Sequence, residues 1–433
     1  MWRIAKRVGA SAFFKGTAIV FIATNIANLL NFLFNLSMGR LLGPDKYGEL
    51  GALVSLFTIL GVVQVVINLY TVKTVSTFAG QSMRGHIAAF QRIFTPWMFA
   101  VGFGIFTLIV IFNRYFSDFL KLSDPKAFIL LAFSSVLSLP VTLNRGVMQG
   151  LMSFVWLGAA IITEMAVKIV LAVFLVLSGL SVFGAVAGSV LGALISYIMT
   201  FIYLNKRFAK VKKDTFKLSL RQLFPLLPAF VTTITLTFLF SVDVVLVRHF
   251  FTPETAGRYM AISTLGKITL YLQGPLVTVM FPLITSRASS GAPYLRFLSV
   301  AILFSLLISA FSMTVFAVFS KPMINLLFGQ GYEAAAAHLT HYALFMGIYA
   351  LCLILTHFLL SVSAFRPLVL LLFIAVLQPF FIFFIHGSIS EVIWVNISVI
   401  LFYFTSACIF VFVSQRIRLL KAIKTLQTYP LYA

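Results

Sequence analysis

The feature that most constrains the fold of this chain is a series of apolar runs long enough to cross a bilayer. A membrane-spanning helix needs about 20 mostly apolar residues. Only 10% of the residues are charged, against about 25% in soluble domains. The chain is therefore predicted to be an all-α, polytopic membrane protein with about 12 transmembrane helices. The twelve runs lie at residues 13–40, 49–72, 93–113, 127–148, 155–179, 182–204, 223–248, 259–283, 296–319, 336–361, 367–386 and 392–414.

The charge pattern predicts how these helices are oriented. A net charge of +22 would suggest a nucleic-acid partner in a soluble protein, but most of this charge lies at the ends of apolar runs. Cytoplasmic connections are rich in lysine and arginine. Placing the N terminus inside puts most basic residues inside and most acidic residues outside. We therefore expect a multi-pass protein of the cytoplasmic membrane with both termini cytoplasmic, no nucleic-acid partner, and an uncleaved tail at residues 1–16.

An internal repeat divides the series of helices into halves. The segment "GPDKYGELGALVSL" (43–56) has a weak copy in "TPETAGRYMAISTL" (252–265), and both follow the first run of a set of six. A basic segment, 205–222, separates the sets. We expect an N-terminal half (1–204), a basic cytoplasmic linker (205–222) and a C-terminal half (223–433). Because six is even, the halves enter the membrane in the same direction, which is typical of parallel-repeat transporters with a central cavity.

Four stretches carry a family resemblance. They are "NFLFNLSMGRLLGPDKYGELGALVSLFTIL" (31–60), "NRGVMQGLMSFVWLG" (144–158), "SVDVVLVRHFFTPETAGRYMAISTLGKI" (241–268) and "INLLFGQGYEAAA" (324–336). With them the chain resembles the polysaccharide-transporter flippases, the Wzx-type exporters of O-antigen and teichuronic acid. These belong to the superfamily of the multidrug and toxin extruders (MATE) and the lipid II flippases.

The resemblance implies a MATE-like fold and the flipping of an undecaprenyl-pyrophosphate-linked oligosaccharide from the inner to the outer leaflet. It also implies alternating access driven by a proton or sodium gradient, with no bound cofactor. A polysaccharide polymerase and glycosyltransferases are the protein partners to expect. A pyrophosphate-sugar head cannot cross hydrocarbon unaided, so a wet, cationic cavity with few charges is predicted.

Glu164 and Lys168 are the first candidates for that cavity, because charges inside spans are costly and mark functional sites by default. They are four residues apart and share a helix face. One interpretation is that Lys168 contacts the pyrophosphate while Glu164 positions it or takes a proton. The alternative is a buried structural ion pair.

Two further charges lie inside spans of the C-terminal half. Lys267 either lines the cavity or extends toward the membrane surface. Asp243 is a candidate ion-coupling residue, as a proton acceptor or a sodium ligand. The alternative is a structural bond from Asp243 to Arg248 or to a neighbouring span.

Other polar residues mark a candidate path for the substrate. Arg40 and Arg248 lie at related exits of the two halves and either receive the phosphate or anchor the outer interface. The first run also carries an amide stripe, which either joins helices or contacts sugar hydroxyls. Its members are Asn25, Asn28, Asn31 and Asn35, with Gln64 and Asn68 on the next run.

Two other function classes remain as alternatives. A cation-coupled multidrug extruder has the same fold but would need an acidic or aromatic cavity. A polytopic enzyme acting on lipid-linked sugars would carry its catalytic residues in large outer loops, whereas the longest outer loop runs only over 113–126. The two cysteines lie inside apolar runs, and His338 and His341 have few acidic neighbours, so no metal site is expected.

Overall fold

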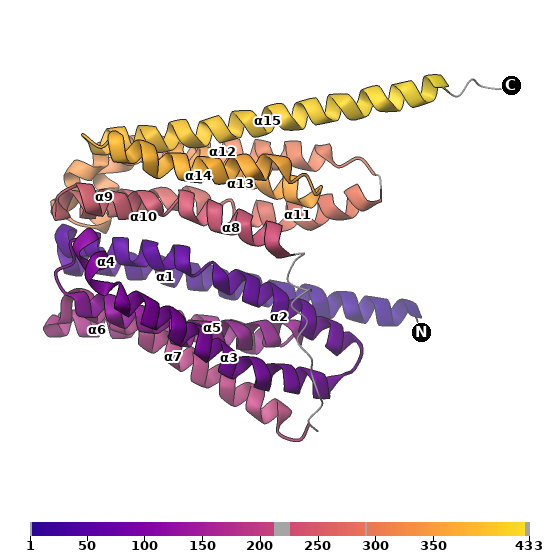
Figure 1. The fold of residues 1–433 in the computed structure, drawn as a ribbon, viewed down its shortest axis with the longest axis horizontal. Helices are drawn as coiled ribbons and strands as arrows, with labels where there is room; N and C mark the ends of the chain where they lie inside the picture. The colour runs from indigo at the N-terminus through magenta and orange to yellow at the C-terminus, as the bar shows by residue number, and fades with distance from the viewer. Residues whose placement is uncertain (1, 212–225, 291, 429–433) are drawn as a thin grey trace. The chain divides into compact units, whose positions relative to one another are not determined.

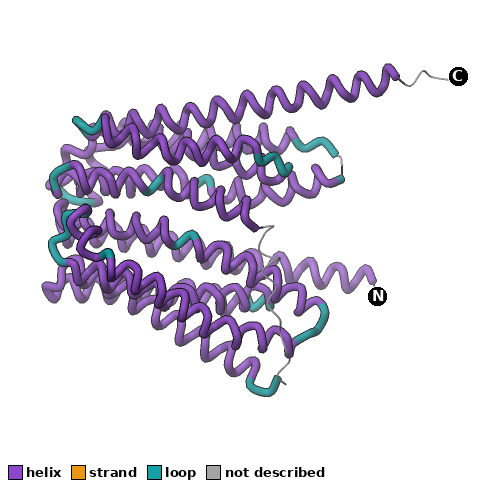
Figure 2. Tube along the Cα trace, viewed as in Figure 1, coloured by secondary structure: helices purple, strands orange, loops and turns teal. Residues whose placement is uncertain are grey.

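The computed structural model describes residues 2–211, 226–290 and 292–428. All the secondary-structure elements in these ranges are helices, which confirms the predicted all-α fold (Figures 1 and 2). The chain forms two compact units. Unit 1 comprises Met1–Phe230, Val247–Ala261 and Ile324–Ala334, and unit 2 comprises Val231–Leu246, Ile262–Met323 and Ala335–Ala433.

Unit 1 contains the helices of the N-terminal part of the chain. They are α1 (Trp2–Leu60), α2 (Val63–Gly80), α3 (Arg84–Ile111), α4 (Asn113–Phe119), α5 (Pro125–Gly150), α6 (Phe154–Leu175), the π-helical turn η1 (Val176–Leu180) and α7 (Ser181–Phe208). Part of the linker predicted at 205–222 lies outside the described residues, which stop at 211 and resume at 226.

Glycines on one face of α7 allow it to pack tightly on α6. A Cβ atom on Gly188 would lie 2.5 Å from the backbone nitrogen of Ala172, and one on Gly192 would lie 2.7 Å from the carbonyl oxygen of Glu164. Small residues at four-residue spacing let membrane helices approach closely. This packing holds the part of α6 that carries Glu164 and Lys168 against α7.

Unit 2 is built from the C-terminal helices. They are α8 (Leu227–Leu239), α9 (Val242–Phe250), α10 (Pro253–Tyr271), α11 (Gly274–Ser289), α12 (Leu295–Leu327), the 3-10 helix η3 (Gln330–Ala335), α13 (Ala336–Ser361), α14 (Arg366–Phe384) and α15 (Ile389–Thr428). Parts of α8, α9, α10 and α12 and most of η3 belong to unit 1.

The predicted number of about twelve membrane helices is not confirmed. The described residues contain ten segments that are long and apolar enough to span a membrane. Two of them, Ala18–Leu60 with 43 residues and Phe154–Phe208 with 55, exceed the roughly 20 residues of one crossing. Each contains a glycine with positive φ, Gly43 (71°) or Gly179 (90°), where the helix is interrupted. The counts differ because helices predicted as separate runs are joined across these tight turns.

The two copies of the repeated motif touch each other within unit 1. A Cβ atom on Gly48 would lie 2.6 Å from the backbone nitrogen of Gly257, and one on Gly257 would lie only 1.7 Å from the carbonyl oxygen of Pro44. Glycine is therefore required at this contact by space alone. The division into two six-helix halves remains a prediction.

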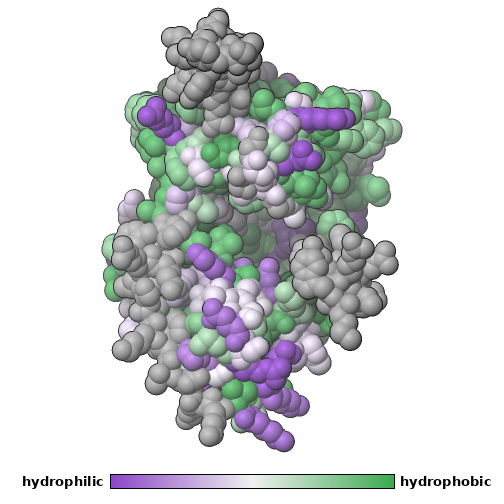
Figure 3. Space-filling view, turned by 90° about the vertical axis from the view of Figure 1, so that its right-hand side faces the viewer, coloured by the Kyte–Doolittle hydropathy of each residue, from purple (hydrophilic) through white to green (hydrophobic). Residues whose placement is uncertain are grey.

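The flanks of the helices are apolar. Exposed large hydrophobic residues occur along most of the described helices, as expected where lipid replaces water. Figure 3 shows a face of the molecule on which patches of hydrophilic side chains lie beside hydrophobic ones. The chain is a multi-pass membrane protein by these criteria.

Candidate functional site

A polar cavity of about 450 Å³ lies inside unit 1 among α1, α2, α3, α5, α6 and α7. Its walls combine aliphatic groups and the aromatic ring of Phe57 with hydroxyls, one amide, one carboxylate and one ammonium group. Such a set can bind sugar hydroxyls and a charged group at the same time. The polar residues that line it are Thr58, Gln64, Ser134, Ser135, Ser138, Glu164, Lys168 and Ser189.

Lys168 reaches from α6 toward α1. Its Nζ donates a hydrogen bond to Oδ1 of Asn31 at 2.9 Å. The same atom lies 4.0 Å from the centre of the Phe34 ring, close enough for a cation–π interaction. An amide oxygen and a ring face carry no net charge, so these two contacts do not neutralise Lys168, and the carboxylate within electrostatic range of it is Glu164, one turn away on α6.

Glu164 forms its ion pair with Arg145 on α5. Nη2 of Arg145 donates to Oε2 of Glu164 and also to Oγ of Ser196 at 2.9 Å. The spacing of four residues makes Lys168 the expected partner of Glu164, but in the structure Lys168 donates to Asn31. Because the charges of Arg145 and Glu164 cancel, Lys168 leaves the group with one net positive charge.

Arg145 is a charged site residue that the sequence pattern did not mark. It lies within the run 127–148, and the structure places it inside α5, with its side chain only 21% exposed. The available signal was its position before the end of that run, together with the adjacent amide of Asn144. That amide donates to the hydroxyl of Thr200 at 3.2 Å.

Gln64 connects the cavity wall to α5. Its Nε2 donates to Oγ of Ser138 at 3.3 Å, and its Oε1 accepts from the hydroxyl of Thr142 at 3.1 Å. These hydrogen bonds hold the amide of Gln64 at the cavity wall beside α5. Sugar hydroxyls can form hydrogen bonds with polar groups of this kind.

The amide stripe of α1 is divided between different environments. Asn31 is the member that contacts Lys168. Asn25 donates to the carbonyl oxygen of Phe21, and Asn35 donates to that of Asn31, each at 2.8 Å. Asn28 is exposed. The structure therefore brings one of the four amides to the charged group.

The two arginines at the predicted exits are engaged by protein groups. Nε of Arg40 donates to the carbonyl oxygen of Leu327 at 2.9 Å. Arg248 is 2% exposed and donates to the carbonyl oxygens of Leu120 (3.0 Å) and Lys121 (2.8 Å).

Arg248 also lies 3.7 Å from the carboxylate oxygens of both Asp45 and Glu49. Glu49 is fully buried and accepts a further hydrogen bond from the hydroxyl of Ser123 at 2.7 Å. A role in receiving phosphate would require Arg248 to leave this buried cluster.

Asp243 is fully buried in unit 2. Its Oδ2 accepts from the hydroxyl of Tyr342 at 3.1 Å and from Nδ2 of Asn396 at 3.4 Å. Gln378 extends the network, since its Nε2 donates to Oδ1 of Asn396 at 2.8 Å. Lys267 is also buried, with Nζ 5.1 Å from the centre of the Phe240 ring and within electrostatic range of Asp243.

This polar network joins α9 to the three consecutive helices α13, α14 and α15, which follow it about 90 residues or more later in the sequence. A buried carboxylate surrounded by amide and hydroxyl groups can take up a proton, or can bind a small hard cation through its oxygen atoms. Among the described residues, no group of three or more histidine, cysteine, aspartate or glutamate side chains is placed to hold a metal ion.

Known proteins resemble this chain in sequence and in structure. Residues 13–287 match the family model described as polysaccharide biosynthesis protein. Comparison with curated protein sequences gives no match.

Solved structures show a similar fold. An inward-facing multidrug resistance MATE family transporter of the MOP superfamily has a TM-score of 0.74 and 14% identity, over 93% of this chain and 99% of that one. The lipid II flippase MurJ, in an inward closed conformation, has a TM-score of 0.69 and 13% identity, over 92% and 87% of the two chains. At these identities the likeness concerns the fold, which is MATE-like and MurJ-like.

Proposed function

Because the chain belongs to the polysaccharide biosynthesis protein family, we propose that it is a flippase for an undecaprenyl-pyrophosphate-linked oligosaccharide. It moves this lipid from the inner to the outer leaflet by alternating access. The product serves the export of a polysaccharide such as O-antigen, capsule, exopolysaccharide or teichuronic acid. The likeness to a lipid II flippase supports a lipid-linked substrate.

The observation that carries the proposal is the net positive charge of the group formed by Arg145, Glu164 and Lys168 at a polar cavity. Arg145 neutralises Glu164, so these three side chains carry one excess positive charge with which an anion in the cavity can interact. An ammonium group binds phosphate as a point charge. The hydroxyl and amide groups around it suit the sugars that follow the pyrophosphate.

A multidrug extruder is the second candidate, because a MATE transporter also has this fold. A cationic drug would be bound by a free carboxylate or by an aromatic cage. The carboxylate that lines the cavity is Glu164, which is paired with Arg145. This pairing favours an anionic substrate over a cationic one.

An enzyme acting on lipid-linked sugars is the third and more distant candidate. The segment between α3 and α5, which is the longest outer loop expected from the sequence, holds only the short helix α4 and a few turns. We propose a transporter, with glycosyltransferases supplying its substrate and a polysaccharide polymerase using its product. Both termini and the linker 205–222 are proposed to be cytoplasmic.

The energy for transport is proposed to come from a proton or sodium gradient acting on Asp243. Its neighbours Tyr342 and Asn396 offer a hydroxyl and an amide at 3.1 and 3.4 Å. Ion binding would replace these hydrogen bonds and shift the helices that provide them, which links the occupancy of Asp243 to conformation.

Flipping of a defined lipid-linked oligosaccharide in proteoliposomes tests the substrate class. Lys168→Gln should abolish most of the transport, while Lys168→Arg, which keeps the charge, should retain much of it. The matched control is Lys126→Gln, an exposed lysine at the start of α5. Parental transport by well-folded Lys168→Gln would exclude Lys168 from the substrate site. Transport of a cationic dye in place of the lipid would favour the multidrug extruder.

A further inference from the structure

A second groove, separate from the cavity of Lys168, lies on the exposed surface of unit 1. It has a volume of about 680 Å³ and is formed by the end of α7 and by Trp156 at the start of α6. Its floor consists of four apolar side chains that recur along one face of α7, namely Ile195, Ile198, Met199 and Ile202. Ile198 and Ile202 are 42% and 47% exposed. It shares no lining residue with the polar cavity.

The polar end of this groove is organised by stacked aromatic rings. Trp156 stacks on Tyr203 with ring centres 5.1 Å apart. The Tyr203 hydroxyl donates to Oγ of Ser153 at 3.0 Å and accepts from Nη1 of Arg207 at 2.8 Å. Arg207 is thereby held at the groove, next to Lys206 in the last turn of α7.

This order of side chains matches a membrane interface. Tryptophan and tyrosine favour the level of the lipid headgroups, so we expect the aliphatic floor to lie in the hydrocarbon region and the cations to lie among the headgroups. Clusters of lysine and arginine at the end of a membrane helix attract anionic lipids.

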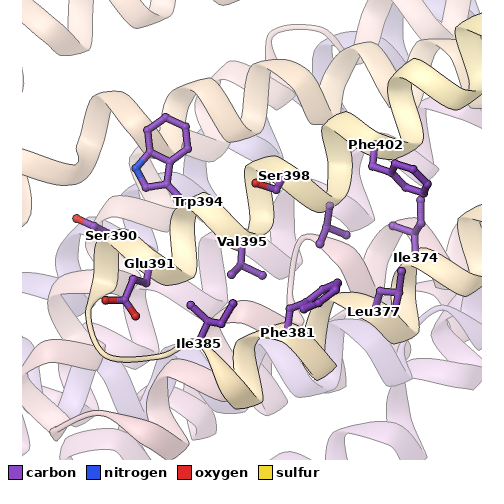
Figure 4. A pocket seen from close by; sticks show the side chains of 11 residues that line it. Ile374, Leu377, Phe381, Ile385, Ser390, Glu391, Trp394, Val395, Ser398 and Phe402 are labelled. Carbon is purple, nitrogen blue, oxygen red and sulfur yellow. The ribbon is translucent and has the colours of Figure 1, made fainter.

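A groove in unit 2 provides a comparison of charge (Figure 4). It lies between α14 and α15, has a volume of about 500 Å³, and is lined mainly by similar aliphatic and aromatic groups. Its polar end carries Ser390 and the carboxylate of Glu391, close to Trp394, and no lysine or arginine is among its lining residues. Both grooves can take an acyl chain, but only the groove of α6 and α7 offers cations to a headgroup.

We propose that the groove formed by α6 and α7 binds an anionic phospholipid of the bilayer. One acyl chain lies along the aliphatic face of α7, and the phosphate lies between Lys206 and Arg207. The lipid is a resident ligand and is distinct from the transported substrate, whose cation is Lys168.

The tryptophans of the chain make this proposal measurable. The protein contains four of them, one in each groove and two elsewhere. Two full-length proteins are made, one keeping only Trp156 and one keeping only Trp394, with phenylalanine at the other positions. Each is reconstituted with phosphatidylglycerol or phosphatidylcholine carrying brominated acyl chains, which quench tryptophans that they contact, and without any lipid-linked oligosaccharide.

Brominated phosphatidylglycerol should quench Trp156 with about a 30-fold higher apparent affinity than brominated phosphatidylcholine, the value expected for two cations near an anionic headgroup. Non-brominated phosphatidylglycerol should reverse the quenching. Trp394 should show no such preference. The double variant Lys206→Gln, Arg207→Gln should lose the preference at Trp156, whereas the charge-matched double variant Lys73→Gln, Arg84→Gln should keep it.

Equal quenching of Trp156 by the two lipids in the otherwise unchanged protein would overturn the proposal. So would the same preference at Trp394, or loss of the preference in the charge-matched control, because either result would mean general attraction of anionic lipid to a basic protein. The result on the unchanged groove stands even if the Lys206→Gln, Arg207→Gln protein fails to fold. Since no transport is measured, the outcome is independent of the proposed flippase activity.

Discussion

Arg145→Gln tests whether the charge of Lys168 depends on the pairing of its neighbours. In the parent protein Arg145 neutralises Glu164, and Lys168 supplies the excess positive charge. Without Arg145, the carboxylate of Glu164 is left facing Lys168, one helical turn away on α6. Opposite charges at this spacing attract each other, so the cavity becomes neutral and Lys168 is no longer available to an anion.

Two magnitudes follow for Arg145→Gln. Removing one partner of a buried pair costs about 3–5 kcal/mol, but this pair is 21% and 17% exposed, so we expect a loss of about 2 kcal/mol in stability. Hydrogen bonds to charged groups are worth about 1.5–3 kcal/mol. Losing one to the pyrophosphate should therefore slow transport of dilute substrate by about 10- to 100-fold.

The decisive measurement is the double variant Arg145→Gln, Glu164→Gln. It removes both charges of the pair and leaves Lys168 again as the excess cation, so both stability and transport should return toward parental values. Thermal unfolding of the purified protein and flipping in proteoliposomes report the two quantities. If the folded double variant stays as inactive as Arg145→Gln, or if Arg145→Gln transports normally, the charge-balance explanation of the cavity is refuted.

Other perturbations test the remaining features. Asp243→Asn should leave the protein folded but make export insensitive to an imposed proton or sodium gradient; unchanged gradient dependence would leave Asp243 with a structural role alone. Gly257→Ala should lower the melting temperature by roughly 4 °C or more, because the added methyl group collides with the backbone of Pro44. A loss of about 1 kcal/mol in stability corresponds to 2–4 °C in a domain of 150–250 residues. A parental melting temperature would show that this contact is loose. A reporter fused within 205–222 should be cytoplasmic and one near Asp118 external, and the reverse result would overturn the proposed orientation.

Much of the fold was predictable because its information is local. The cost of exposing backbone groups to lipid makes an apolar run of sufficient length a helix, whatever surrounds it. Charged residues inside such runs are visible in one dimension, so the sequence alone marks Lys168 and Asp243 as candidates. The number of membrane helices was harder to predict from the sequence, because tight turns at Gly43 and Gly179 join runs that composition alone separates.

The partners of those residues were decided by the tertiary structure. Helix periodicity shows that Glu164 and Lys168 share a face, but it does not show that α5 brings Arg145 to Glu164 or that Ser196 of α7 accepts a hydrogen bond from Arg145. In the same way, the sequence marks four equivalent amides on α1, and packing selects Asn31 for Lys168.

The groove formed by α6 and α7 also depends on a long-range contact, since Trp156 and Tyr203 meet only when α6 and α7 pack against each other. Residues on one helix have spacings set by the hydrogen-bonded backbone. Contacts between helices depend on which faces fit together and on where glycine permits close approach. For this protein the sequence by itself determined that the chain lies in a membrane, and it marked some of the charges inside the spans, such as Lys168 and Asp243. The tertiary structure decided the partners of these charges: Glu164 pairs with Arg145, and Lys168 donates to Asn31.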